Sequence, residues 1–192
     1  MKRCLALFAL AAAALAATFT VTPDPRWKII GPGGGGAQFS PTLSPHNPSR
    51  VLVACDMTGS YITDDAGESW HNFNLMGVSR FFVFDPHDPD RIYAQAAGLW
   101  RTANGGKSWE LIDPRPESIK EVTMPDDHAG VRFLTEGPEP GNISALAVDP
   151  ADSKILYAAV SSEAGAVLRL SDDGAESWRD AGVIPIAATR LY

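Results

Sequence analysis

Two aromatic residues occupy matching places in the chain and have side chains suited to sugar recognition. Tyr61 and Trp100 each stand two residues before a threonine that opens a repeated phrase. Aromatic rings beside a groove can stack on the faces of sugar rings, but rings of this size also fill hydrophobic cores. The sequence therefore leaves two interpretations of Tyr61 and Trp100, a weak substrate contact and core packing.

Other residue types that carry chemistry lack the spacing that chemistry requires. The run Gly33–Gly36 has neither the lysine nor the helix of a phosphate-binding loop. The histidines are scattered without the spacing of metal ligands: His46, His71, His87 and His128. His46 and His87 fall at the same place in two proline corners, which favours a role in turns. We expect no cofactor and no metal.

Three copies of one eight-residue phrase organise the chain. They are TDDAGESW (Thr63–Trp70), TANGGKSW (Thr102–Trp109) and SDDGAESW (Ser171–Trp178). A proline corner followed by an apolar run precedes each copy, and the corners contain Pro45, Pro86 and Pro150. Two phrases repeated in fixed order indicate one supersecondary unit stacked on copies of itself, and the period fits the four-stranded blade of a β-propeller.

The repeat predicts an all-β fold with about three propeller blades. The expected units are about 37–75, 78–112 and 142–182 within a domain 17–192. Short β-branched and aromatic runs separated by Gly, Asp, Asn and Pro predict the strands, most clearly in the second unit. Its strands are expected at Ser79–Phe84, Arg91–Ala96, Gly98–Ala103 and Ser108–Ile112.

The repeated phrase has a structural explanation that needs no ligand. Its acceptor side chain can bind backbone N–H groups of its own turn, its glycine can take a positive φ, and its tryptophan can pack between sheets. The residues with this expected role are Thr63, Asp65, Gly67, Trp70, Thr102, Asn104, Gly106, Trp109, Ser171, Asp173 and Trp178. Asn104 keeps the acceptor, whereas Ala175 stands at a glycine position and predicts a reshaped third turn. Asp85 and Asp149, at the proline corners, are expected to be turn acceptors.

The first residues predict export. Residues 1–16 have the basic start, apolar run and small-residue exit of a secretory signal peptide, which favours a secreted or periplasmic protein without a membrane span. Cleavage would remove Cys4 and leave Cys55 as the only thiol. It would also remove two of 16 cations, so the formal charge would change from −7 to 14 − 23 = −9. Such a surface disfavours nucleic acid as a partner.

Two further segments do not fit three complete units. Residues 113–141, rich in proline and charge, are an insertion expected at the surface, with a small hairpin around Val131–Leu134. The segment Trp27–Ile30 is similar to an outer strand, and 184–192 is similar to the start of a further blade. Because propellers close into rings of four to eight blades, we expect the remaining blades to come from further sequence or from another chain.

The repeated phrases resemble the Asp-box of BNR-repeat β-propellers, which include sialidases, sortilin-type receptors and family 74 glycoside hydrolases. Residues 27–75 resemble more specifically the first blade of the xyloglucan-active family 74 enzymes. There a Gly-rich stretch precedes a phrase T-D-x-G-G-x-Y whose aspartate is the general base. The resemblance implies that Asp56 is the base and that Gly59 and Tyr61 lie beside the substrate. Cys55 replaces the threonine of that phrase, so the match is partial.

Two hypotheses follow. In the first, the intact protein is a secreted polysaccharide hydrolase of the xyloglucanase type that uses inverting acid/base chemistry. Inversion needs a second carboxyl group about 6.5–9.5 Å from the base, and the resemblance implies that this acid comes from a second propeller. In the second, the protein is a non-catalytic propeller, like sortilin-type or photosystem-assembly propellers, that binds protein or glycan. Asp56 then only caps the turn at Gly59.

Overall fold

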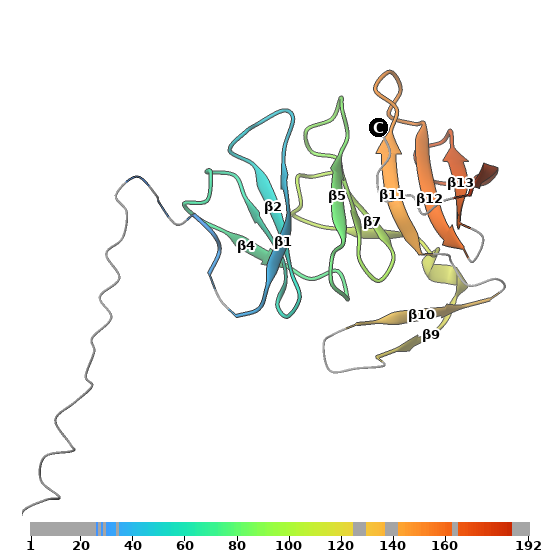
Figure 1. Ribbon diagram of the computed structural model, residues 1–192, viewed down its shortest axis with the longest axis horizontal. Coiled ribbons are helices and arrows are strands. Elements are labelled where there is room, and N and C mark those ends of the chain that lie inside the picture. The colour runs from blue at the N-terminus through green and yellow to red at the C-terminus, as the bar shows by residue number, and fades with distance from the viewer. Residues whose placement is uncertain are drawn as a thin grey trace, which may run out of the picture.

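The computed structural model describes residues 26, 28, 30–33, 35–124, 130–136, 142–162 and 165–185. Within these ranges the chain forms three four-stranded antiparallel sheets and one two-stranded sheet. Figure 1 shows the three larger sheets side by side in chain order. We call them the first, second and third blade. The predicted signal peptide and most of the segment 184–192 lie outside the described residues.

Each blade is a meander in which every strand pairs with the next strand along the chain. The first blade consists of β1 (Gln38–Leu43), β2 (Val51–Cys55), β3 (Gly59–Thr63) and β4 (His71–Phe73). The second consists of β5 (Phe81–Phe84), β6 (Ile92–Gln95), β7 (Leu99–Thr102) and β8 (Glu110–Asp113). The third consists of β11 (Ile143–Val148), β12 (Leu156–Ser162), β13 (Gly165–Ser171) and β14 (Arg179–Ile184). The strands of the second blade thus lie where the sequence predicts them, within one or two residues at each end.

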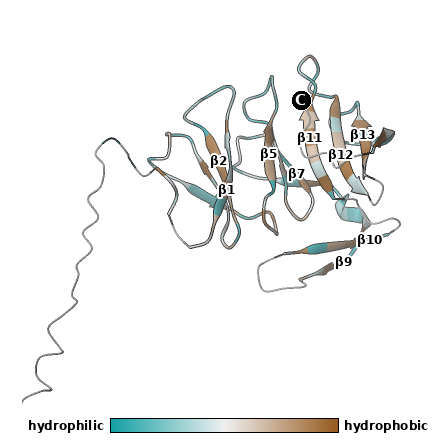
Figure 2. Ribbon diagram, viewed as in Figure 1, coloured by the Kyte–Doolittle hydropathy of each residue, from teal (hydrophilic) through white to brown (hydrophobic). Residues whose placement is uncertain are grey.

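Apolar side chains between neighbouring blades form the core. One cluster joins the first blade to the second and includes Leu52 and Ile92, both fully buried. A second cluster joins the second blade to the third around Leu99 and Leu156, also fully buried. Figure 2 shows the corresponding hydrophobic colour along the strands and hydrophilic colour in many of the loops. Burying each such side chain contributes about 1.5–3 kcal/mol, so packing of blade on blade is the main stabilising term.

The predicted insertion contains a small sheet. After the 3-10 turn η1 (Pro116–Ser118), β9 (Ile119–Thr123) pairs with β10 (Arg132–Thr135). The small hairpin expected around Val131–Leu134 is larger than predicted, because that segment forms only its second strand and the first lies at Ile119–Thr123. The backbone N–H of Val131 donates to the carbonyl of Met76 at 3.2 Å, which ties the hairpin to the link between the first two blades.

The meander gives each blade two different edges. The box edge carries the proline corners (44–50, 85–91 and 149–155) and the box turns, which are the three repeated phrases. The variable edge carries the turns 56–58 and 96–98, the approach to β1 at 35–37, and the start of β5. In Figure 1 the turns that follow β2 and β6 lie along the lower edge, the edge on which the β9–β10 hairpin also lies.

Candidate functional site

Asp56 lies on the variable edge, directly after β2. Its side chain is half-buried, and its Oδ1 atom accepts a hydrogen bond of 2.8 Å from the backbone N–H of Ala37. The backbone N–H of Asp56 in turn donates to the carbonyl of Ala37 at 3.2 Å. These two bonds fix the carboxylate against the chain that leads into β1.

The approach to β1 passes closest to Asp56 at Gly36, which has no side chain. Gly36 has φ +97°, and a Cβ atom there would lie 2.5 Å from Asp56 Oδ1 and 2.9 Å from Cys55 Sγ. Both features exclude a larger residue at Gly36. Gly36 therefore covers the Asp56 carboxylate closely, whereas a Cβ atom at Gly33 or Gly35 would have no neighbour within 4 Å.

A short polar network lies beside Asp56. The Thr58 hydroxyl donates to Cys55 Sγ at 3.2 Å and is 2.7 Å from the Tyr61 hydroxyl. Burial alone would raise the pKa of the Cys55 thiol, but hydrogen bonds from the Thr58 hydroxyl and from the backbone N–H groups of Met57 and Thr58 outweigh it and lower the pKa. The network holds Tyr61 and Cys55 in fixed positions around the turn.

The remaining residues of the candidate phrase have clear structural explanations. Gly59 has φ +93°, and a Cβ atom there would lie 2.6 Å from the carbonyl oxygen of Phe73, so the turn itself requires glycine. Trp100 is half-buried and packs against the core cluster between the first two blades. For Trp100 this position favours core packing, and its contact with a substrate stays a prediction.

The box edge shows the same contacts in all three blades. In the first, the Thr63 hydroxyl accepts from the N–H groups of Asp65 and Gly67 at 3.2 and 3.0 Å, while Asp65 Oδ1 accepts from the Ser69 N–H at 2.8 Å. Asn104 repeats the last bond with the Ser108 N–H at 2.9 Å, as the sequence predicts.

The expected reshaping of the third box turn is wrong. The Ser171 hydroxyl accepts from the Ala175 N–H at 2.9 Å, and Asp173 Oδ1 accepts from the Ser177 N–H at 2.9 Å. Ala175 adopts the positive φ (+71°) that Gly106 adopts at +87°. The bonds of the turn are sufficient to hold alanine in this conformation, which it rarely adopts.

The box carboxylates are strongly bound by their own turns. Hydrogen bonds from the Ser69 hydroxyl and N–H, and then from Thr63, lower the pKa of Asp65 far below its ordinary value. The equivalent bonds from Ser177, and then from Ser171, lower the pKa of Asp173 to about 2. Their hydrogen bonds within the turn explain both shifts without a ligand.

The proline corners join each blade to the next. Asp85, fully buried, accepts from the N–H groups of His87 and Asp88 at 2.8 and 3.0 Å and from the Ser153 hydroxyl of the third blade at 2.7 Å. Burial alone would raise the pKa of Asp85, but these bonds and the charge of Arg91 outweigh it and lower the pKa. Asp85 is thus a turn acceptor, as predicted.

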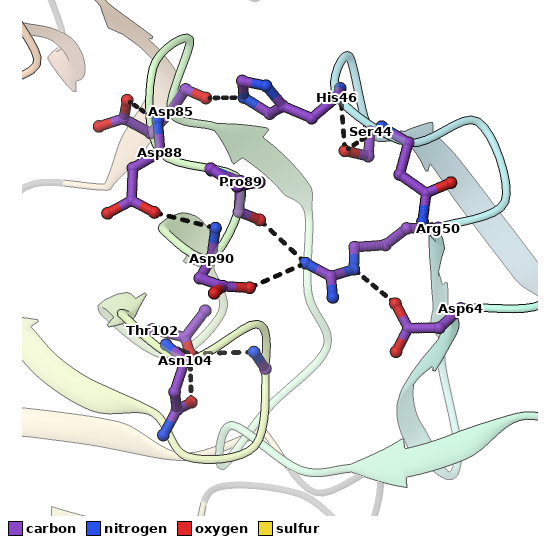
Figure 3. Close-up of polar contacts among 12 residues, drawn as sticks. Ser44, His46, Arg50, Asp64, Asp85, Asp88, Pro89, Asp90, Thr102 and Asn104 are labelled. Carbon is purple, nitrogen blue, oxygen red and sulfur yellow. Dashed lines mark hydrogen bonds and ion pairs between the residues drawn. The ribbon is translucent and has the colours of Figure 1, made fainter.

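The two predicted corner histidines make the same contact across successive blades. His46 Nε2–H donates to the carbonyl of Asp85 at 2.8 Å, and His87 Nε2–H donates to the carbonyl of Pro150 at 2.9 Å. Figure 3 shows the first of these contacts beside Arg50, whose guanidinium donates to the carbonyl of Pro89 at 2.9 Å. A structural role therefore accounts for both histidines.

The described residues offer no second acid in contact with Asp56. Asp149 accepts from the Ala151 N–H at 2.8 Å and is a turn acceptor like Asp85. Within the described ranges, no three His, Cys, Asp or Glu side chains are grouped as metal ligands would be. No helix in the described part of the chain is long and apolar enough to cross a membrane.

Two residues on the variable edge were missed by sequence reasoning. Gln95, at the end of β6, and Asp113, at the end of β8, line one groove together with the β9–β10 hairpin. Aligning the proline corners could have revealed Gln95, because alanine occupies its place in the other two blades, at Ala54 and Ala159.

Comparison with known proteins gives one consistent result. No family model matches the chain. The chain is 29% identical over 183 residues to xyloglucanase Xgh74A of Acetivibrio thermocellus, which covers 87% of this chain and 20% of that protein. It is 31% identical over 179 residues to a xyloglucanase of a Paenibacillus species, covering 85% of this chain and 16% of that protein. The chain thus spans a fifth or less of the length of these relatives.

A solved structure agrees with the sequence comparison. The crystal structure of an ancestral GH74 enzyme matches 80% of this chain and 19% of its own, with a TM-score of 0.57 and 24% sequence identity. This likeness confirms the predicted all-β propeller class. Together the comparisons support a glycoside hydrolase-like propeller with a partial set of blades.

Proposed function

We propose that this chain supplies propeller blades to a secreted glycoside hydrolase of the xyloglucanase type and that Asp56 is its general base. The observation that carries the proposal is the agreement of two facts. The chain is similar to xyloglucanases over 85–87% of its length, and Asp56 stands at the end of β2 with Gly36 packed closely against its carboxylate. The substrate is then a polysaccharide whose backbone runs along the variable edge.

The contacts of Asp56 suit a base that activates water. One carboxylate oxygen is held by the Ala37 N–H at 2.8 Å, so the other oxygen takes the proton of an attacking water. The water oxygen bonds to the anomeric carbon as the glycosidic C–O bond breaks. A carboxylic acid from another segment then protonates the leaving oxygen, at the spacing of about 6.5–9.5 Å that inversion needs.

The same proposal covers export and closure. Residues 1–16 direct the chain out of the cytoplasm, and further blades from the same protein or from another chain complete the ring. Tyr61, fixed by the Thr58 hydroxyl at 2.7 Å, lies beside the substrate. Nucleic acid is not a partner of this acidic chain.

A second function has one observation in its favour. The bond from the Ala37 N–H to Asp56 is also the bond that a purely structural aspartate would make at the start of β1. The alternative is a non-catalytic extracellular propeller that binds glycan or protein at the same edge.

Asp56→Asn in the full-length protein separates the two functions. Asparagine keeps the acceptor for Ala37, so folding and affinity for a xyloglucan heptasaccharide should be unchanged. Xyloglucan hydrolysis should fall at least about 100-fold because the general base is lost. Asp65→Asn on the box edge is the matched control and should keep full hydrolysis. Undiminished cleavage by the Asp56 variant would remove this residue from the mechanism, and binding without cleavage by the unmodified protein would favour the non-catalytic alternative.

A further inference from the structure

A groove of about 640 Å³ lies on the variable edge of the second blade. The turn 96–98 and the end of β8 form one side, and the β9–β10 hairpin and the start of β11 form the other. Pro114, Val131 and Phe133 contribute apolar surface, while Gln95 and Asp113 contribute polar groups. The groove is distinct from the Asp56 turn, which belongs to the first blade.

Gln95 is unusual for its position in the sheet. It pairs with Phe81 at the place where Ala54 pairs with Phe39 in the first blade and Ala159 pairs with Ala145 in the third. Both alanines are fully buried, and Gln95 is only 4% exposed. The first and third blades thus use a small apolar residue here, and the buried amide of Gln95 costs stability in the second blade unless it is fully hydrogen-bonded.

The amide of Gln95 is only half satisfied. Its Nε2 donates to the carbonyl of Ala96 at 3.2 Å, whereas its Oε1 has no partner among the residues that the structure describes. If the side-chain amide of Gln95 were flipped, its oxygen would face the carbonyl oxygen of Ala96, and two acceptors cannot bond. The contact therefore identifies Oε1 as the atom without a partner. The other buried groups in this condition are the Tyr93 hydroxyl, which can donate as well as accept, and the indole N–H donors of Trp100, Trp109 and Trp178. Among these unsatisfied groups of the described part, Gln95 Oε1 is the one that can only accept.

Asp113 adds a second acceptor to the same groove. It is half-buried at the end of β8. Burial raises the pKa of its carboxyl group, and the charges of Arg169 and Arg115 only partly oppose this shift. This half-buried carboxyl group can accept hydrogen bonds from a ligand that carries donors.

The lining of the groove identifies the ligand class. Two acceptors require a ligand with O–H or N–H donors, and the apolar wall suits a ring with C–H faces. Arg80 and Arg132 also line the groove and disfavour a cationic ligand. A neutral sugar ring combines hydroxyl donors with apolar faces.

We propose that this groove binds one neutral glycosyl unit, whose hydroxyl groups donate to Gln95 Oε1 and to the carboxyl group of Asp113. Because Oε1 is covered by its neighbours, the end of the Gln95 side chain turns toward the sugar on binding. The inference rests on the proposed function, since it places a second contact with the same polysaccharide on the edge that carries Asp56. The role of the hairpin is to form the wall of this site.

Gln95→Ala tests the proposal, because it installs the residue that the other two blades use. The thermal unfolding midpoint should stay the same or rise, while the affinity for cellotetraose and for a xyloglucan heptasaccharide, measured by calorimetry on the full chain, should fall about tenfold. Asp113→Asn should also weaken both sugars. His87→Ala on the box edge is the control and should lower the midpoint without changing affinity.

Two results would overturn the inference. One is wild-type affinity in Gln95→Ala and Asp113→Asn, and the other is a midpoint that falls in Gln95→Ala, which would make Gln95 a structural residue. Neither result affects the Asp56 proposal, which depends on hydrolysis by Asp56→Asn. Conversely, full hydrolysis by Asp56→Asn would refute the role of Asp56 as the base, but a loss of sugar affinity in Gln95→Ala would still support the groove as a binding site.

Discussion

The box edge and the variable edge of the same blades differ in how strictly they repeat. On the box edge, a Thr or Ser hydroxyl binds the same two N–H groups in every blade, and corner histidines connect successive blades in the same way. On the variable edge, the residue after β2 is Asp56, whereas Ala97 takes the equivalent place in the second blade, and among the described residues a hairpin follows only the second blade. Contacts that recur in every blade are explained by the packing of one blade on the next. Residues that occur in a single blade lack this explanation and are the better candidates for function.

The largest effect that would test this difference is expected at Asp85. Asp85→Ala removes the buried acceptor of two backbone N–H groups, of the Ser153 hydroxyl and of the Arg91 guanidinium. The free energy of unfolding should fall by about 3 kcal/mol, because these donors are left unpaired. Asp85→Ser should cost only about 1 kcal/mol, because Ser44 makes the same turn in the first blade with bonds of 3.2 and 3.3 Å. Urea unfolding measures both. Equal losses would show that the turn bonds are not what Asp85 contributes.

A smaller effect is expected at the corner histidines. His46→Ala removes one hydrogen bond between the first and second blade and should lower the free energy of unfolding by about 1 kcal/mol. His71 is exposed on β4, so His71→Ala should change the free energy of unfolding by less than about 0.5 kcal/mol. If the two variants are equally stable, the contact between corners does not hold the blades together.

The smallest effect is a pH dependence at the box turns. Asp173 has a pKa of about 2 in the folded chain, below the value of about 3.9 in an unfolded one. Its ionised form therefore stabilises the fold above about pH 4, and this contribution is lost as the pH falls toward 2. Asp173→Asn should keep the turn, as Asn104 does, and flatten the dependence of the unfolding midpoint on pH between 5 and 2. An unchanged slope would contradict the assignment of the low pKa to these turn bonds.

Much of the fold could be predicted from the sequence because its signals are local. The box turns and proline corners contain their own hydrogen-bond partners, so the strands between them, the capping role of Asp85 and the acceptor role of Asn104 could be read directly. The third box turn was the exception, since the φ of Ala175 depends on how strongly the bonds of Ser171 and Asp173 constrain it.

The variable edge was harder to predict because its contacts join distant segments. The cover of Asp56 by Gly36 depends on how the approach to β1 passes the end of β2, and the groove at Gln95 depends on where an insertion folds. Neither follows from spacing in the sequence. The one available signal was the glutamine in place of two alanines, and it appears only when the blades are aligned with one another.

The most direct test of the account is to map a bound sugar onto the two edges. Backbone amide signals of the chain would be followed by NMR during titration with a xyloglucan heptasaccharide. The account predicts shifts at Gly36 and Ala37, in the turns 56–61 and 95–98, and near Asp113, with the box turns unchanged. Shifts concentrated at 63–70, 102–109 and 171–178 would contradict it, because they would place binding on the edge assigned here to structure.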